Sequence, residues 1–204
     1  MSDIISDAVS QAELVVFDLD DTLVDEGVWL NAAYAAISRI AAPEDDRTAA
    51  KIAQSLSAGR LSHGRAGLFE RVRSDFPMAR GDTSSWLAAM RNTEVRGGLE
   101  IVPWALNLCE TFPDKQLAIL TNGNATQQRN KYRQLVPCGA RNRFRLYCAS
   151  DLEPKPSPSS LLTILSDFEC IPEDAVFLGD HPTDRECANR AGVPFLRAPL
   201  LGLP

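Results

Sequence analysis

The sequence predicts an α/β protein in which helices cover both faces of a parallel sheet. Five short apolar runs of strand length occur along the chain, and amphipathic helical patterns lie between the later ones. A long helical stretch without strands follows the first run. The composition is ordinary for a globular chain, with 45% hydrophobic and 24% charged residues among 204. These observations indicate one α/β core with a helical insertion.

The expected strands are short, and helical segments separate the later ones, which favours parallel pairing with crossover helices. They occupy residues 14–18, 117–120, 146–149, 175–178 and 194–196. The helices between the later strands are expected near residues 104–112, 125–135, 161–168 and 184–191. Residues 135–145 are unusually basic where a short apolar turn is expected.

Residues 25–96 show four apolar stripes at helical spacing and no convincing strand. Trp29 and Trp86 belong to these stripes, so we expect them to pack the insertion. Gly97 and Gly98 are expected to form the hinge back into the core. The predicted domains are therefore a core of residues 1–24 and 97–204 and a helical cap of residues 25–96.

Charge and cysteine content narrow the function classes. The net charge is −6, which disfavours nonspecific nucleic-acid binding because such binding needs Lys and Arg against phosphates. The five cysteines form no CxxC pair, which favours reduced thiols over a zinc site or disulfides. Because no signal-like or membrane-spanning run is present, we expect a soluble cytoplasmic protein with no membrane partner.

The most informative motif is the pair Asp18 and Asp20 at the end of the first strand. Side chains alternate along an extended backbone, so the two carboxylates are expected to face the same side. Such a pair repels itself unless a cation lies between the carboxylates or one of them keeps a proton. The pair therefore suggests a metal site with a nucleophile and an acid/base, although aspartates also close turns and cap helices.

Further polar residues follow the later strands. Thr121 and Asn122 come after the second strand and offer a hydroxyl and backbone N–H groups for an anion. Lys155 lies between two prolines that restrict its backbone, so its ammonium group could neutralise the negative charge of a phosphate. Asp180 and Asp184 follow the fourth strand. Carboxylates meeting at one sheet edge would hold Mg²⁺, which prefers oxygen ligands.

These motifs make the chain resemble the haloacid dehalogenase (HAD) superfamily, in the subgroup with an α-helical cap after the first strand. The resemblance implies a Rossmann-like three-layer core with a parallel sheet of about five strands. It covers essentially the whole chain, and the motifs follow the family order. They are Phe17-Asp18-Leu19-Asp20-Asp21-Thr22-Leu23, Leu120-Thr121-Asn122-Gly123, Lys155-Pro156, and Gly179-Asp180 with Asp184.

The resemblance implies a Mg²⁺-dependent phosphatase that works through an aspartyl-phosphate. Asp18 is then the nucleophile, and Asp20 protonates the leaving oxygen and later activates water. The implied Mg²⁺ ligands are Asp18, the Asp20 backbone carbonyl and Asp180. Asp184 would support the metal or the motif lysine from beside it.

Thr121 and the Asn122 amide are implied to hold phosphate oxygens, while Lys155 offsets charge on the nucleophile and the phosphoryl group. The expected partner is a small phosphorylated metabolite. The protein is expected to be a monomer or a homodimer. The cap contains a basic cluster near glycines, formed by Arg60, His63 and Arg65. This segment is either a loop that reaches a second anionic group of the substrate or a solvent-exposed connection between two helices.

Other activities share this core. Dehalogenases of the family lack the second aspartate, which is present here as Asp20, so dehalogenation is not expected. Phosphonate hydrolysis would need a cap lysine to form a Schiff base, and nothing in the sequence near Lys51, the one lysine between Asp20 and Arg96, suggests that role. A sugar-phosphate mutase differs only in closure and water exclusion, so it stays open. A phospho-ligand-binding protein without turnover also stays open. His181 receives no role.

Overall fold

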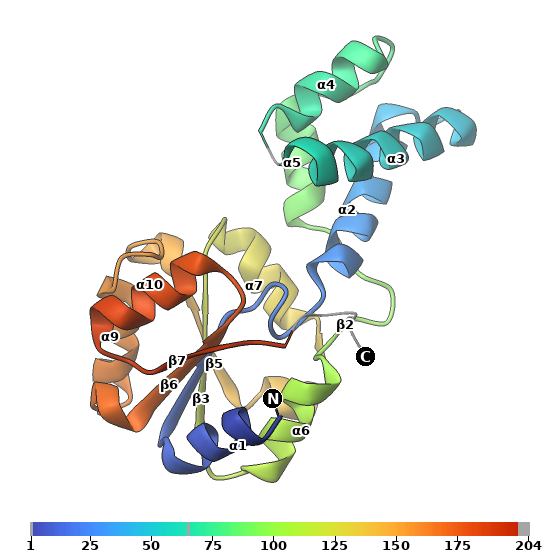
Figure 1. Cartoon of the computed structure of the whole chain (residues 1–204). Helices are drawn as coiled ribbons and strands as arrows, with labels where there is room; N and C mark the ends of the chain where they lie inside the picture. Colours follow the sequence, from blue (N-terminus) through green and yellow to red (C-terminus); the bar gives the residue numbers. More distant parts are fainter. Residues whose placement is uncertain (1, 65, 200–204) are drawn as a thin grey trace. The chain divides into compact units, whose positions relative to one another are not determined.

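The computed structural model describes residues 2–64 and 66–199 and divides the chain into two compact units (Figure 1). The first unit takes the chain up to Glu26 and again from Gly98 onward, and the second is Gly27–Gly97. The boundaries expected from the sequence, 24/25 and 96/97, lie within two residues of these. Gly97 and Gly98 both have a φ of 90°. Because side chains rarely adopt this conformation, glycines suit the junction.

A parallel five-stranded sheet in the order β5-β3-β1-β6-β7 forms the centre of the first unit. The middle strand β1 pairs with both β3 and β6, with Phe17 opposite Ile119 and Leu178. All of β1 is buried, which explains why its apolar run does not alternate. The five expected strands are confirmed, with ends shifted by up to two residues. Their bounds are β1 Leu14–Phe17, β3 Gln116–Thr121, β5 Phe144–Cys148, β6 Ala175–Gly179 and β7 Phe195–Arg197.

Helices cover both faces of this sheet, as expected (Figure 1). On one face, Leu161 of α9 and Cys187 of α10 join the buried cluster that includes Phe177. On the other face, the ring of Trp104 in α6 lies 6.3 Å from the ring of Phe17. The N-terminal helix α1 was not expected from the sequence. The bounds are α1 Ser2–Gln11, α6 Pro103–Thr111, α7 Ala125–Arg133, α9 Ser159–Asp167 and α10 Pro182–Ala191, with short 3₁₀ turns at Ala149–Asp151 and Pro172–Asp174.

The basic segment 135–145 is not a simple turn, and its arginines end two helices. Arg143 donates hydrogen bonds to the carbonyls of Phe112 and Pro113, just beyond α6. Arg141 donates to the carbonyl of Arg133 at the end of α7 at 2.7 Å. Positive charge at a helix C-terminus is favourable, which explains the composition of the segment. The sequence analysis missed β4 Leu135–Val136 and α8 Cys138–Arg141 in this segment. It also missed β2 Leu99–Glu100, the parallel partner of β4.

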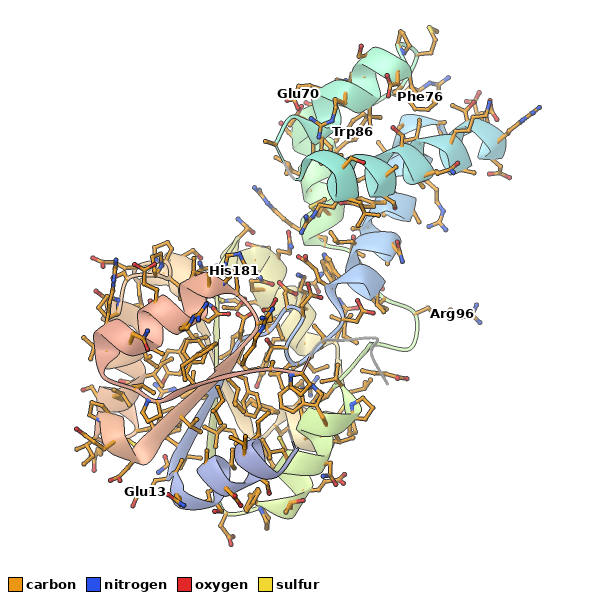
Figure 2. The ribbon with its side chains drawn as sticks, viewed as in Figure 1. Glu13, Glu70, Phe76, Trp86, Arg96 and His181 are labelled. Atoms are coloured by element: carbon orange, nitrogen blue, oxygen red, sulfur yellow. The ribbon has the colours of Figure 1, made fainter. Side chains whose placement is uncertain are left out.

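The second unit is a helical bundle, which matches the four expected stripes. Its core includes Trp86 (Figure 2). The Trp86 ring meets Phe69 edge-on at 5.4 Å, and the Arg73 guanidinium lies over the same ring at 4.4 Å. Trp86 also donates to the Arg80 carbonyl at 3.0 Å. Trp29 and Trp86 are both fully buried, and the hydrophobic cluster of this unit includes Trp86, as expected. The bounds are α2 Glu26–Ala41, α3 Asp46–His63, α4 Leu68–Asp75 and α5 Thr83–Arg91.

The loop expected around Arg60 is wrong in part. Helix α3 continues through His63, so Arg60 lies in its last turns and is half-buried. Asp45 caps the start of α3 by accepting a hydrogen bond from Thr48 N, which favours one long helix. The side chain of His63 and the whole of Arg65 lie outside the described residues.

The cysteines and the helix lengths add two observations. All five cysteines are free, and four of them are buried. Burial raises the pKa of Cys109 and of Cys187 to about 11, which keeps both thiols protonated. Among the residues described, no helix combines the length and apolarity that crossing a bilayer requires.

Candidate active site

The carboxyl ends of three neighbouring strands carry the polar residues predicted from the sequence. Asp18 directly follows β1, Thr121 is the last residue of β3, and Asp180 follows β6. The Asp18 N–H donates to the Leu178 carbonyl at 2.9 Å, so the pairing with β6 continues one residue beyond the strand. Ligands of parallel α/β sheets bind at this edge.

Lys155 joins two of the predicted aspartates. Its Nζ lies 2.7 Å from Asp18 Oδ1 and 2.7 Å from Asp184 Oδ1, and it donates to the Leu120 carbonyl at 2.9 Å. The side chains of Lys155 and Asp184 are 2% and 1% exposed. Burial alone would lower the pKa of Lys155, but the charges of Asp18 and Asp184 raise it above its ordinary value. The lysine is therefore a fixed, charged group between two carboxylates.

Asp18 itself is short of positive charge. Burial raises its pKa from 3.8 to about 7 and outweighs the attraction of Lys155, while the negative charges of Asp184 and Asp20 raise it further. The pKa of Asp180 is also raised, first by burial and then by the charge of Asp184. A bound cation would relieve both effects, because it favours the ionised form of a carboxyl group.

Asn122 fixes the backbone of Lys155. Its Nδ2 donates to the Lys155 carbonyl at 2.9 Å, and its Oδ1 accepts from the Lys155 N–H at 2.9 Å. Thr121 is 1% exposed, and its hydroxyl donates to the Asn122 carbonyl at 3.2 Å. The second strand end is thus tied to the loop that carries the lysine, a link that the sequence did not suggest.

Asp20 is bound by two residues that the sequence analysis missed. Lys131 Nζ lies 2.6 Å from Asp20 Oδ1, and Gln128 Nε2 donates to Asp20 Oδ2 at 3.0 Å. The strand alternation used for Asp20 does not apply, because β1 ends at Phe17 and Asp20 forms an isolated bridge with Val24. Lys131 and Gln128 are spaced three residues apart on α7, and that spacing is the signal that places them on one helix face.

Three carboxylates meet closely enough to hold a metal ion. Asp18, Asp180 and Asp184 each place one oxygen so that the three lie within 4.8 Å of one another. Asp184 is also bound from two sides, by Lys155 at Oδ1 and by the His181 N–H at Oδ2, 3.0 Å away. A Cβ on Gly179 would lie 2.6 Å from Asp184 Oδ2, so this close approach requires glycine. The oxygen-only donor set suits a divalent cation of the Mg²⁺ type.

Two further residues noted in the sequence occupy other positions in the fold. His181 is exposed and lies at the start of α10 (Figure 2). It caps this helix, because its Nδ1 accepts from the Thr183 N–H at 3.3 Å. Arg60 belongs to the helical unit. The structure therefore brings together Asp18, Lys155, Asp180 and Asp184, places Thr121 and Asn122 at the adjoining strand end, and ties Asp20 to α7.

Similar solved structures have the same fold. They include a HAD-superfamily hydrolase of subfamily IA from Geobacter sulfurreducens PCA, with 22% identity and a TM-score of 0.58 over 93% of this chain and 89% of that one. CbbY from Rhodobacter sphaeroides, solved with xylulose-(1,5)bisphosphate, has 22% identity and a TM-score of 0.59 over 92% and 86%. A 2-haloacid dehalogenase from Pseudomonas syringae pv. Tomato has 26% identity and a TM-score of 0.56 over 90% and 85%.

A search of curated proteins found no match. The family model of haloacid dehalogenase-like hydrolases, however, matches residues 12–192, which include every strand-end residue described above. This match spans most of the chain and agrees with the fold and with the acidic cluster at the sheet edge. The chain therefore belongs to the haloacid dehalogenase-like hydrolases.

Proposed function

We propose that this hydrolase is a Mg²⁺-dependent phosphatase that acts on a small phosphomonoester through an aspartyl-phosphate. One observation carries the proposal: a second carboxylate, Asp20, is held by Lys131 and Gln128 beside the nucleophile candidate Asp18. An alkoxide leaving group needs a proton, whereas a halide does not. The retained acid therefore favours phosphate esters over the 2-haloacids that one structural relative acts on.

Asp18 suits the role of nucleophile. A carboxylate oxygen of Asp18 would bond to the substrate phosphorus while the bond from phosphorus to the leaving oxygen breaks. Lys155, 2.7 Å from Asp18, stays in place during this step because Asn122 fixes its backbone. Its ammonium group then offsets the charge that develops on the phosphoryl group.

Asp20 would transfer a proton in each half of the reaction, first as an acid and then as a base. It would donate one proton to the departing oxygen and then take one from the water that attacks the phosphorus. That attack breaks the bond between the phosphorus and Asp18 and releases inorganic phosphate. Thr121 and the Asn122 N–H, at the end of β3, are positioned at the sheet edge where phosphate oxygens would bind.

The acidic cluster fits Mg²⁺. The ion would be held by Asp18, Asp180 and the Asp20 backbone carbonyl. Asp184, which lies beside them, would support the ion or Lys155. When bound, Mg²⁺ supplies positive charge to phosphate oxygens that would otherwise be repelled by these carboxylates. The pKa of Asp18, raised to about 7 mainly by burial and in spite of Lys155, supports this proposal, because a bound cation would favour the ionised carboxylate.

The test is phosphate release from a panel of sugar phosphates, phosphoglycolate, nucleoside monophosphates and para-nitrophenyl phosphate. Wild type and Asp18→Asn are assayed with Mg²⁺ or with EDTA. Release that needs Mg²⁺ and is lost in Asp18→Asn supports the proposal. Halide release from a 2-haloacid without phosphate release would instead assign dehalogenation, and isomerised sugar phosphate without phosphate release would assign a mutase.

A further inference from the structure

We infer that Lys131 and Gln128 are positioning residues that hold the Asp20 carboxylate with one defined oxygen available for proton transfer. The inference rests on the proposed phosphatase function, because it assigns how the acid/base of that reaction is oriented. Both residues come from α7, a helix whose buried side chains are Gln128 and Lys131. A helix that buries an amide and an ammonium group toward Asp20 needs a reason beyond packing.

Lys131 is the stronger of the two contacts. Its side chain is completely buried, and its Nζ lies 2.6 Å from Asp20 Oδ1 and 3.7 Å from Glu26 Oε1. Glu26 is 6% exposed, whereas Asp20 is 18% exposed and is the more accessible of the two acids. A buried ammonium group between two carboxylates restricts both, and the shorter contact is the one to Asp20.

Gln128 holds the other oxygen of Asp20 more loosely. Its Nε2 donates to Asp20 Oδ2 at 3.0 Å and also to the Asn122 carbonyl at 2.7 Å. The reversed amide would set its oxygen against two acceptors, so this orientation follows from the contacts. Within the described residues, the buried Oε1 has no hydrogen-bond partner. Gln128 therefore acts on Asp20 through its NH2 group alone, whose second hydrogen is available for the Asn122 carbonyl.

The two contacts distinguish the oxygens of Asp20. Oδ1 receives a short, charge-assisted hydrogen bond from Lys131, which disfavours a proton on that oxygen. Oδ2 receives a longer bond, 3.0 Å, from a neutral amide group whose other hydrogen is available for the Asn122 carbonyl. The geometry thus assigns proton transfer to Oδ2, with Lys131 fixing the carboxylate plane and Gln128 linking it to the loop after β3.

A purely structural role is the competing explanation, in which Lys131 only neutralises the buried Glu26. The two explanations differ in how activity depends on the leaving group. Loss of a well-placed acid slows esters of poor leaving groups more than esters of good ones, since only the former need the proton. Loss of folding or of phosphate binding slows both esters equally.

The experiment compares para-nitrophenyl phosphate, a good leaving group, with para-methoxyphenyl phosphate, a poor one of similar size. The measured quantity is kcat/KM, which reports the steps up to release of the phenol. We expect Lys131→Met to lose about 10- to 100-fold more kcat/KM on the methoxy ester than on the nitro ester. Gln128→Leu should show a smaller loss with the same preference, and Lys131→Arg should recover part of it.

Three further variants serve as controls. Lys115→Met removes a lysine that binds the carbonyls of Ser10 and Ala12, so it should leave the ratio between the two esters unchanged. In an Asp20→Asn background, Lys131→Met should not change the ratio further, because both changes act on one group. Glu26→Gln with Lys131→Met removes both charges and should keep the selective loss even if the single variant is unstable.

The outcomes separate the inference from the proposed function. An equal loss on both esters in the charge-neutral double variant, or an unchanged ratio in Lys131→Met, overturns the inference while the phosphatase assignment stands. A wild type that releases phosphate from neither ester and from no member of the metabolite panel rejects the phosphatase assignment, and the inference falls with it. Selective loss, partial recovery by arginine and no further effect in Asp20→Asn together support it.

Discussion

The raised pKa of Asp18 makes a quantitative prediction about stability. Its pKa is raised from 3.8 to about 7, so the folded protein binds this proton more tightly than the unfolded chain does. The protonated Asp18 contributes its full stability below pH 3.8, the pKa of the group in the unfolded chain. This stability is lost as the pH rises through about 7. A rise of about 3 pKa units corresponds to about 4 kcal/mol at pH 8.

Asp18→Asn removes this cost, because the amide carries no charge and its oxygen still accepts from Lys155. Lys155 also keeps the charge of Asp184, 2.7 Å away. In metal-free protein we therefore expect Asp18→Asn to raise the free energy of unfolding by about 2–4 kcal/mol at pH 8. The gain should be about 2–3 kcal/mol smaller at pH 5, where the cost of ionisation is only partly developed.

Urea unfolding with EDTA at pH 5 and pH 8 measures this difference. The matched control is Asp151→Asn, which removes a carboxylate of the same unit that is 46% exposed and pairs with Arg129 on the surface. That change should cost less than about 1 kcal/mol at either pH. An Asp18→Asn variant that is no more stable than wild type at pH 8, or equally favoured at both pH values, would refute the reasoning.

Two further predictions follow from named contacts, and a third tests the anion-binding role that the sequence suggests for Arg60. Asn122→Ala removes both hydrogen bonds to the Lys155 backbone, so kcat/KM for para-nitrophenyl phosphate should fall at least about 10-fold. An unchanged kcat/KM would show that these two hydrogen bonds do not contribute to catalysis. Arg143→Ala leaves backbone carbonyls at the end of α6 without their donor, so urea unfolding should show a loss of about 2 kcal/mol with kcat/KM unchanged. Arg60→Ala should raise KM several-fold for a substrate with a second anionic group while kcat stays constant, and an unaltered KM would exclude that role.

Much of the fold was predictable because its strands are continuous apolar runs bounded by turn residues. The middle strand β1 is buried throughout, and the runs for β3 and β6 are apolar for the same reason. The two-residue strands β2 and β4 carry no periodicity that a sequence pattern would reveal. The basic stretch around Arg143 was also uninformative, because Arg143 binds carbonyls just beyond α6 that lie far away in the sequence.

The site was predictable where its residues follow strands. Asp18, Lys155 and Asp184 were expected at one sheet edge, and the structure joins them through two contacts of 2.7 Å. Lys131 and Gln128 were missed because α7 has almost no apolar residues, so periodicity does not show which face is buried. Polar side chains that face inward look the same in a sequence as polar side chains that face solvent.

The two buried lysines divide the charge of the site between two tasks. Lys155 is shared by Asp18 and Asp184, and Lys131 is shared by Asp20 and Glu26, so each ammonium group faces two carboxylates. Each group of three therefore keeps a negative charge when all members are ionised, and Asp180 adds to the excess beside Asp18. A phosphate ester is also an anion, so neither lysine alone makes its entry favourable. Because the excess lies at the three carboxylates that meet within 4.8 Å, a divalent cation bound there would act where the repulsion is greatest. Lys131 lies with the other pair of acids, which is why we assign it to holding Asp20 and not to binding phosphate.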